Sequence, residues 1–258
     1  MILFQGAKFA LVLLIILIYI ILVLPLYPLL LAFPKFMKPL LVRIYGFLGG
    51  VEIWILGVRY KVIDPHNMLG KKGYLIVSNH QSYLDMFLHS NCFPSSFVTS
   101  TDVKRMPFIG QITTMAGCVF VDRKGRHNIQ NELKEITDTL NDGHNVTFYP
   151  EATSSDGSQV LPFKRSLFEA SIIAKKEILP ITLNYEKIDG EKITNSNRNF
   201  VNWYADMEFF PHLWQMCRLR RIFVSLQIHA PFYIDTDDTR VIRDKAYEII
   251  NSGFRPYP

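Results

Sequence analysis

Short apolar runs recur through the last three quarters of the chain, with amphipathic stretches between them. Continuous apolar runs of strand length are typical of buried strands, whereas apolar residues three and four positions apart predict helices. The sequence predicts strands at residues 74–78, 96–99, 118–121, 145–149, 178–185 and 222–228, and helices at 129–140, 167–176 and 239–252. Their alternation predicts an α/β fold with a largely parallel sheet flanked by helices.

The N-terminal part of the chain has a different pattern. No charged residue lies between Lys8 and Lys35. At ~1.5 Å per residue, the part of this run before Pro25 reaches roughly 24 Å, which is short of the ~30 Å hydrocarbon core of a bilayer. Pro25 and Pro28 should kink or break a helix here.

A second apolar stretch, residues 39–56, contains Arg43 and Glu52, whose charges are costly in the middle of a membrane. We therefore expect a two-helix, membrane-embedded element that dips into one leaflet. One kinked span is the alternative, and a signal peptide is disfavoured because no small-x-small cleavage site follows. The expected division is a membrane-associated element at residues 1–60 and an α/β domain at 61–258, joined around residues 57–64.

Composition fits this organisation. The 258 residues are 49% hydrophobic and carry a net charge of +5, which suits one domain plus a membrane element at an anionic surface. The three cysteines are widely spaced, so we expect neither a disulfide framework nor a metal site, and we expect no cofactor and no nucleic acid partner. A basic collar is expected at that surface, with an ordinary solvated rim as the alternative: Lys35, Lys38, Arg43, Arg59 and Lys61.

The stretch NHQSYLD carries the clearest candidate chemistry. The strand at 74–78 should end in a turn that presents His80, followed by a helix whose first turn carries Asp85. A histidine that acts as a base works best when a carboxylate fixes its tautomer and stabilises the imidazolium. The alternative is a helix-capping histidine with an acidic residue that complements the helix dipole.

Three further blocks follow in order, GCVFVDR at 117–123, FYPEATSS at 148–155 and Leu-Pro-Ile at 179–181. With these four blocks the chain resembles the glycerolipid acyltransferases, the 1-acylglycerol-3-phosphate acyltransferase family. The resemblance implies a membrane-bound enzyme at the cytoplasmic face of the bacterial inner membrane. It would move a fatty acyl group from acyl-CoA or an acyl carrier protein to the free hydroxyl of a lysophospholipid, most often 1-acylglycerol-3-phosphate.

The resemblance also implies roles for single residues. His80 would be the general base and Asp85 its orienter, Glu151 would help to organise the acceptor site, and Arg123 would help to bind the acceptor phosphate. The remaining matches are expected to bind the acceptor (Thr153, Lys164 and Arg165) or to shape the site (Asn79, Gly117, Phe120 and Pro180). Ser82 and Cys118 are conceivable nucleophiles, but direct transfer without an acyl-enzyme is the simpler interpretation.

The chain departs from the family pattern in the region of the acceptor phosphate. Ser154 stands where the family has a phosphate-clamping Arg, and Ser100 and Thr101 stand where it often has a Lys pair. Ala152 replaces a Gly, and its Cβ disfavours a positive φ, which points to an altered loop. Arg123, Lys164 and Arg165 could compensate, or the acceptor could carry a different head group.

Other functions are open at this stage. The aromatic segment at 203–214 resembles lyso-ornithine-lipid and other lysolipid acyltransferases, although an interfacial aromatic belt explains it equally well. A thioesterase is disfavoured because no Gly-x-Ser-x-Gly elbow occurs. A catalytically silent lipid-binding protein is disfavoured because His80, Asp85 and Glu151 are intact.

Overall fold

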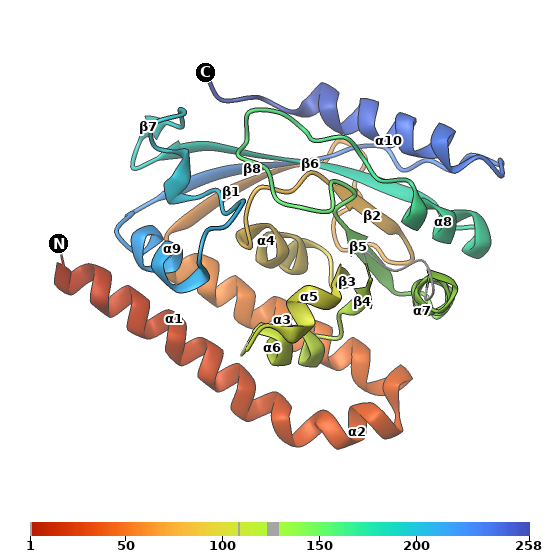
Figure 1. The fold of residues 1–258 in the computed structure, drawn as a ribbon, viewed down its shortest axis with the longest axis horizontal. Helices are drawn as coiled ribbons and strands as arrows, with labels where there is room; N and C mark the ends of the chain where they lie inside the picture. The colour runs from red at the N-terminus through yellow and green to blue at the C-terminus, as the bar shows by residue number, and fades with distance from the viewer. Residues whose placement is uncertain (1, 108, 123–128) are drawn as a thin grey trace.

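The computed structural model describes residues 2–107, 109–122 and 129–258, and a mixed, mostly parallel sheet lies at its centre (Figure 1). The sheet has eight strands in the order β1-β8-β6-β2-β5-β3-β4, with β7 paired to β6. All neighbours are parallel except β8 and β7, which run antiparallel to β6. The strands are β1 Val58–Ile63, β2 Leu75–Ser78, β3 Ser95–Ser100, β4 Val119–Val121, β5 Asn145–Phe148, β6 Ile178–Ile188, β7 Glu191–Lys192 and β8 Ile222–Ile228.

Helices cover both faces of this sheet (Figure 1). Successive residues of a strand point to opposite faces, so Ile76 packs on one side with α3, α4 and α9, while Leu75 and Val77 pack on the other with α7, α8 and α10. The helices are α1 Ile2–Val23, η1 Leu24–Leu26, α2 Tyr27–Ala32, α3 Pro34–Ile55, α4 Leu84–Cys92, α5 Thr101–Arg105, α6 Ile109–Met115, α7 Ile129–Asn141, η3 Ser166–Phe168, α8 Glu169–Ala174, η4 Arg198–Phe200, α9 Phe209–Met216 and α10 Thr239–Gly253.

The predicted α/β fold is confirmed, and every predicted strand and helix is present to within a few residues. One strand at the edge of the sheet, β1, was not predicted; it pairs with β8. Its exposed Arg59 and Lys61 interrupt the run of apolar residues by which a strand is predicted, and charged residues are common on edge strands. The expected boundary at residue 60 falls inside this strand, and the division into two domains stays a prediction.

Among the described residues, only 2–32 are apolar and long enough to cross a membrane, so the expected two-helix membrane element has one clear apolar helix and not clearly two. A 3₁₀ turn at Leu24–Leu26, which contains Pro25, interrupts this run as expected. The second expected helix, α3, packs along α4 instead. There is no room for a Cβ at Gly46 or Gly50, where it would lie 2.7 Å from the Ser90 carbonyl oxygen and 2.3 Å from Asn91 Nδ2.

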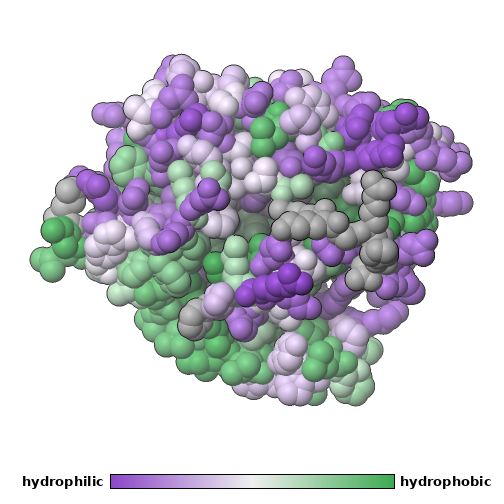
Figure 2. All heavy atoms as spheres, in the orientation of Figure 1, coloured by the Kyte–Doolittle hydropathy of each residue, from purple (hydrophilic) through white to green (hydrophobic). Residues whose placement is uncertain are grey.

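The outer face of the N-terminal helices is apolar. Leu17, Ile21 and Leu22 of α1 each expose about half of their side chain or more. Figure 2 shows these apolar side chains gathered over α1, whereas the side of the molecule near α10 is hydrophilic. An exposed apolar surface of this extent marks a contact with lipid or with another protein.

Polar contacts hold the start of α1 on the α/β domain. Lys8 is buried, and its Nζ donates to the carbonyl oxygens of Leu56 at 2.8 Å and Leu219 at 2.7 Å. Gln5 Nε2 donates to the carbonyl oxygen of Trp214 at 2.8 Å. The first turns of α1 therefore lie beside the end of α3 and beside α9, and the N-terminal hairpin starts and ends at the same domain.

We predict that Lys8→Met lowers the free energy of unfolding by about 2 kcal/mol, because two carbonyl oxygens lose a charged donor. Lys61→Met, at an exposed position of β1, is the matched control and should change the free energy by less than ~0.5 kcal/mol. Denaturant unfolding in detergent measures both. Equal stability of the two variants would show that the Lys8 contacts do not hold the helix.

Candidate active site

The candidate site lies at the carboxyl ends of β2 and β5, as expected for neighbouring parallel strands. Asn79 fastens the turn after β2 to β6, because its side chain accepts from the N–H of Leu183 and donates to the carbonyl oxygen of Leu183, both at 2.8 Å. Pro180 lies buried in β6, beside Val77 of β2. These contacts set the position at which His80 leaves the sheet.

His80 and Asp85 form the pair that the motif predicts. The distance from His80 Nδ1 to Asp85 Oδ2 is 2.8 Å, and Asp85 is fully buried in the first turn of α4. The same Oδ2 accepts from the backbone N–H groups of Gln81 at 2.6 Å and Ser82 at 2.9 Å. Because Nδ1 is engaged by the carboxylate, Nε2 is the ring nitrogen that is free to accept a proton.

Tyr185 and Tyr149 complete this arrangement, although no sequence pattern predicted a role for either. The hydroxyl of Tyr185, on β6, donates to Asp85 Oδ1 at 2.6 Å. The ring of Tyr149 stacks on the imidazole of His80, with centroids 4.1 Å apart and planes inclined by 12°. Neither contact could be read from spacing, although a tyrosine inside a buried strand is a signal that its hydroxyl has a partner.

Glu151 supports the His80 backbone. Its Oε1 accepts from the N–H of His80 at 2.7 Å, and its Oε2 accepts from the N–H of Leu161 at 2.8 Å. The side chain is only 4% exposed, and burial raises its pKa to about 8 while the two backbone donors lower it. In the structure Glu151 is thus a brace between two loops, and both of its oxygens are occupied.

His80 opens onto a cavity of about 520 Å³. One wall is apolar and comes from α1, α3 and α4, including Ile16, Leu48 and Phe87. The other wall carries hydroxyl and aromatic groups, including Ser154 and Trp203. Such a combination, an apolar chamber with a few polar groups beside a potential base, suits an amphipathic substrate.

Comparisons with known proteins agree with this geometry. A family model described as Acyltransferase matches residues 59–184. The 1-acyl-sn-glycerol-3-phosphate acyltransferase of Neisseria gonorrhoeae is 31% identical over 181 residues, which cover 70% of this chain and 69% of that protein. The chain belongs to the acyltransferase family. This finding confirms the resemblance that the four motifs indicated.

Two more relatives bear on the acyltransferase. The lyso-ornithine lipid O-acyltransferase of Rhodobacter capsulatus is 38% identical over 173 residues, which cover 65% of this chain and 59% of that protein. The crystal structure of the 1-acyl-sn-glycerophosphate acyltransferase PlsC from Thermotoga maritima superposes with a TM-score of 0.60 at 18% identity, over 94% of both chains. At that identity, this likeness establishes the fold alone.

The third block of the acyltransferase has a positive φ at Ala152 despite the substitution there. Ala152 has φ of 60°, so the positive φ that its Cβ disfavours is present all the same. Ser154 donates its hydroxyl hydrogen to the carbonyl oxygen of Trp203. Where the family pattern has an Arg, this chain thus fastens the 203–210 segment to the third block. Thr153 and Ser154 both line the cavity.

Other expected acceptor residues lie elsewhere. Lys164 and Arg165 are exposed, and neither is among the described residues that line the cavity. Gly117 has φ of 74° and lies against Val42, and Phe120 lies under Lys104 Nζ at 4.9 Å from its ring centre. Arg123 lies outside the described residues. The structure therefore brings together His80, Asp85, Glu151, Asn79 and Thr153.

The two conceivable nucleophiles are badly placed for that role. Ser82 is fully buried, and its Oγ accepts from the N–H of Leu84. Burial raises the pKa of the Cys118 thiol to about 12, which leaves almost no thiolate at neutral pH. Neither residue is among those described as lining the cavity. This geometry favours direct transfer.

We predict that His80→Ala lowers kcat by about 10²- to 10⁴-fold, the usual contribution of a positioned base, and that Asp85→Ala is milder. Tyr185→Phe should lower kcat roughly tenfold, because one hydrogen bond to a charged group is lost. It should also move the acid limb of the pH profile to higher pH, since Asp85 then presents more negative charge to the imidazole. Turnover of radiolabelled acyl-CoA between pH 5 and 9 measures these effects. A uniform loss at every pH would assign Tyr185 a purely structural role.

We further predict that Ala152→Gly stabilises the protein by about 1 kcal/mol, because glycine adopts a positive φ without a steric penalty. Ala170→Gly, in helix α8, is the contrasting control and should destabilise it by a similar amount. Thermal unfolding of both variants tests the claim. A destabilised Ala152→Gly variant would contradict it.

Proposed function

We propose that this acyltransferase moves a fatty acyl group from a thioester donor to a free hydroxyl of a lysolipid. The observation that carries the proposal is the buried His80–Asp85 pair, at 2.8 Å, opening onto a cavity with one apolar wall. The activity named for the Neisseria gonorrhoeae relative supports it. Acyl-CoA and an acyl carrier protein both remain in the proposal as donors.

In the proposed reaction, His80 Nε2 takes the proton of the acceptor hydroxyl as its oxygen attacks the thioester carbonyl carbon. Asp85 stabilises the imidazolium that forms. When the tetrahedral intermediate collapses, the carbon–sulfur bond breaks and the proton passes to the leaving thiolate. The ester and the free thiol are the products, and no residue of the protein is acylated. Tyr149 and Glu151 keep the imidazole in position for both proton transfers.

The acyl chain would occupy the apolar wall formed by the N-terminal helices. Residues of α1 and α3, such as Ile20 and Leu48, line the cavity together with His80. We therefore propose that residues 1–60 serve both as the membrane element and as part of the acyl pocket of the catalytic domain. The contacts of Lys8 with the domain support a hairpin that lies along one leaflet at the cytoplasmic face, where the donor is present.

A second candidate acceptor follows from the charges of the cavity. Among the described residues that line it there is no Lys or Arg, and of its two acidic residues Asp102 is exposed, whereas burial raises the pKa of Glu52 to about 8. A phosphate monoester such as that of 1-acylglycerol-3-phosphate lacks a charged partner in that part of the wall. This observation favours a zwitterionic head group as the alternative, in line with the activity named for the Rhodobacter capsulatus relative.

We predict that Ser154→Arg raises the preference for lysophosphatidic acid over a zwitterionic lysolipid by roughly tenfold, because it restores a charge-assisted contact. The measurement is the ratio of kcat/KM for the two acceptors. Ser154→Ala is the matched control, since it also removes the hydrogen bond to Trp203 but adds no charge.

Two outcomes would contradict parts of this proposal. A wild-type preference for lysophosphatidic acid above about a hundredfold, near 2.7 kcal/mol, would exclude the zwitterionic acceptor. Release of free fatty acid with no transfer to any lysolipid would instead identify a thioesterase and overturn the proposed function.

A further inference from the structure

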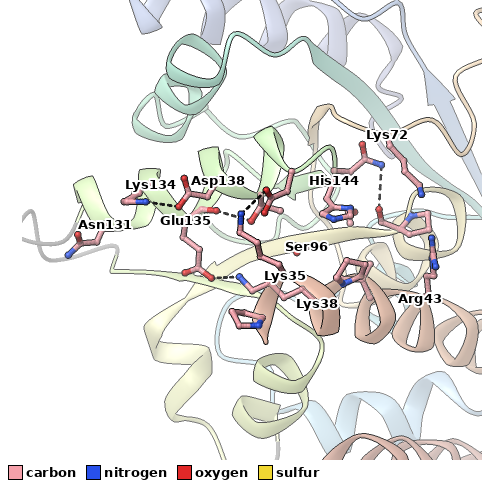
Figure 3. Close-up of a pocket in the computed structure, with 18 residues that line it drawn as sticks. Lys35, Lys38, Arg43, Lys72, Ser96, Asn131, Lys134, Glu135, Asp138 and His144 are labelled. Carbon is pink, nitrogen blue, oxygen red and sulfur yellow. Dashed lines mark hydrogen bonds and ion pairs between the residues drawn. The ribbon is translucent and has the colours of Figure 1, made fainter. Parts of the chain in front are cut away.

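A second polar cleft lies away from the catalytic cavity. It has a volume of about 310 Å³ and lies between α3 and α7, at the amino ends of β3 and β5 (Figure 3). His80 follows the carboxyl end of β2, so the two sites open at opposite ends of the parallel strands. Among the described residues, none lines both spaces.

Ion pairs neutralise most of the charge in this cleft. Its three paired lysines bind carboxylates on α7 or just after its end: Lys35 to Asp142 at 3.2 Å, Lys38 to Glu135 at 2.6 Å and Lys134 to Asp138 at 2.7 Å. Two members of the expected basic collar, Lys35 and Lys38, are thus used to join α3 to α7. Figure 3 shows Lys35 and Lys38 reaching toward the α7 side of the cleft, whereas Lys134 and Asp138 pair along α7 itself.

Two cations are left over at one end of the cleft. Arg43 and Lys72 line it and are exposed, and neither has an ion-pair partner among the described residues. Burial lowers the pKa of the nearby His144 imidazole, the Asp142 carboxylate opposes this effect, and Lys72 and Arg43 add to the lowering, so both cations lie close to the ring. Figure 3 places Arg43 and Lys72 at the same end of the cleft, near His144. A guanidinium, an ammonium and an imidazole that face one space are suited to an anion such as a phosphate.

An apolar groove continues from this end. It has a volume of about 450 Å³, runs along the outside of α3 and shares Arg43 and Pro94 with the polar cleft. Phe47 and Trp54 line it and are 72% and 68% exposed. They lie seven positions apart, hence on one face of the helix, and extend in the direction that leads away from Arg43.

We propose that the cleft and the groove together bind one anionic phospholipid, separately from the substrates of the reaction. Its phosphate would lie between Arg43, Lys72 and His144, and one acyl chain would lie along α3 over Phe47 and Trp54. The two uncompensated cations select a negatively charged head group. The adjoining apolar groove selects a lipid over free phosphate, because a phosphate ion would leave the two aromatic side chains in water.

The proposed lipid has a structural consequence. It would connect α3, which belongs to the N-terminal hairpin, with Lys72 of the loop before β2 and with the amino end of β5. The membrane would then hold the domain at a fixed orientation through a single bound lipid as well as through the apolar face of α1. Because this site and His80 lie at opposite ends of the strands, loss of lipid binding should leave the chemical step intact.

The test uses the 258-residue chain in dodecyl maltoside micelles, with dioleoyl phosphatidylglycerol, dioleoyl phosphatidylcholine and inorganic phosphate as probes. Native mass spectrometry counts the lipids retained on the wild type and on the double variant Arg43→Gln, Lys72→Gln. Arg59→Gln with Lys61→Gln, two exposed cations of β1, is the matched control. A second variant, Phe47→Ala with Trp54→Ala, removes the proposed chain contacts and keeps both cations.

We expect the wild type to retain one phosphatidylglycerol in preference to phosphatidylcholine. The Arg43, Lys72 variant should bind it about ten- to thirtyfold more weakly, from ~1 kcal/mol for each cation, while the control pair binds it as the wild type does. The Phe47, Trp54 variant should also bind it more weakly. Transfer activity on micellar substrate should stay within twofold of wild type in each case.

Several results would overturn the proposal. Equal losses in the Arg43, Lys72 variant and in the control would show general surface attraction instead of a site. Undiminished binding by the Phe47, Trp54 variant, together with displacement of the lipid by millimolar inorganic phosphate, would identify a free-anion site. Equal retention of phosphatidylcholine would contradict the selection for charge.

Discussion

The carboxylate of Asp85 is the interaction on which the rest of the site depends. It is fully buried and accepts from His80 Nδ1, from the N–H groups of Gln81 and Ser82, and from the Tyr185 hydroxyl. A buried charge is tolerated only when its lone pairs are satisfied in this way. The same contacts that keep the carboxylate in the interior therefore fix the turn after β2, the first turn of α4 and the central part of β6 relative to one another. The imidazole of His80 is therefore oriented by the hydrogen bond that it makes to this buried carboxylate.

A second constraint is the shared wall between the N-terminal hairpin and the catalytic sheet. The buried ammonium of Lys8 holds the start of α1 near the end of α3, and the glycines of α3 allow this helix to approach α4 closely. The hairpin therefore forms one side of the cavity that contains His80 while its opposite face remains apolar and exposed. An acyl chain in the cavity would then be covered by apolar side chains of the hairpin, which suits substrates that are lipids.

The loop of the third block keeps the Glu of the family pattern at Glu151 and departs from that pattern at Ala152 and Ser154. Ala152 accepts a conformation that favours glycine, at a cost of roughly 1 kcal/mol, and Ser154 bonds to the backbone of the 203–210 segment instead of presenting a charge. Glu151 stays in place because its two oxygens accept from the backbone N–H groups of His80, in the turn after β2, and Leu161, further along its own loop. Both hydrogen bonds of Glu151 are thus present, whereas the positive charge of an Arg beside them is absent. A difference in head-group recognition would arise from this missing charge.

Patterns among residues close together in the sequence were enough to predict the sheet, its flanking helices and the His80–Asp85 pair. Buried parallel strands must be continuously apolar, and a base and its orienter five positions apart are placed by one turn and one helix start. The edge strand β1, the short helices α5, α6 and α9, and the partners Tyr185 and Tyr149 could not be read in this way. Tyr185 lies a hundred positions from Asp85, and only the pairing of β2 with β6 brings it close. The second helix looked like a membrane segment because its composition is apolar, but packing against α4 buries one of its faces inside the protein and leaves Phe47 and Trp54 exposed on another. Which apolar face meets lipid and which meets protein is decided by the partners available in the fold, and a hydropathy pattern does not record them.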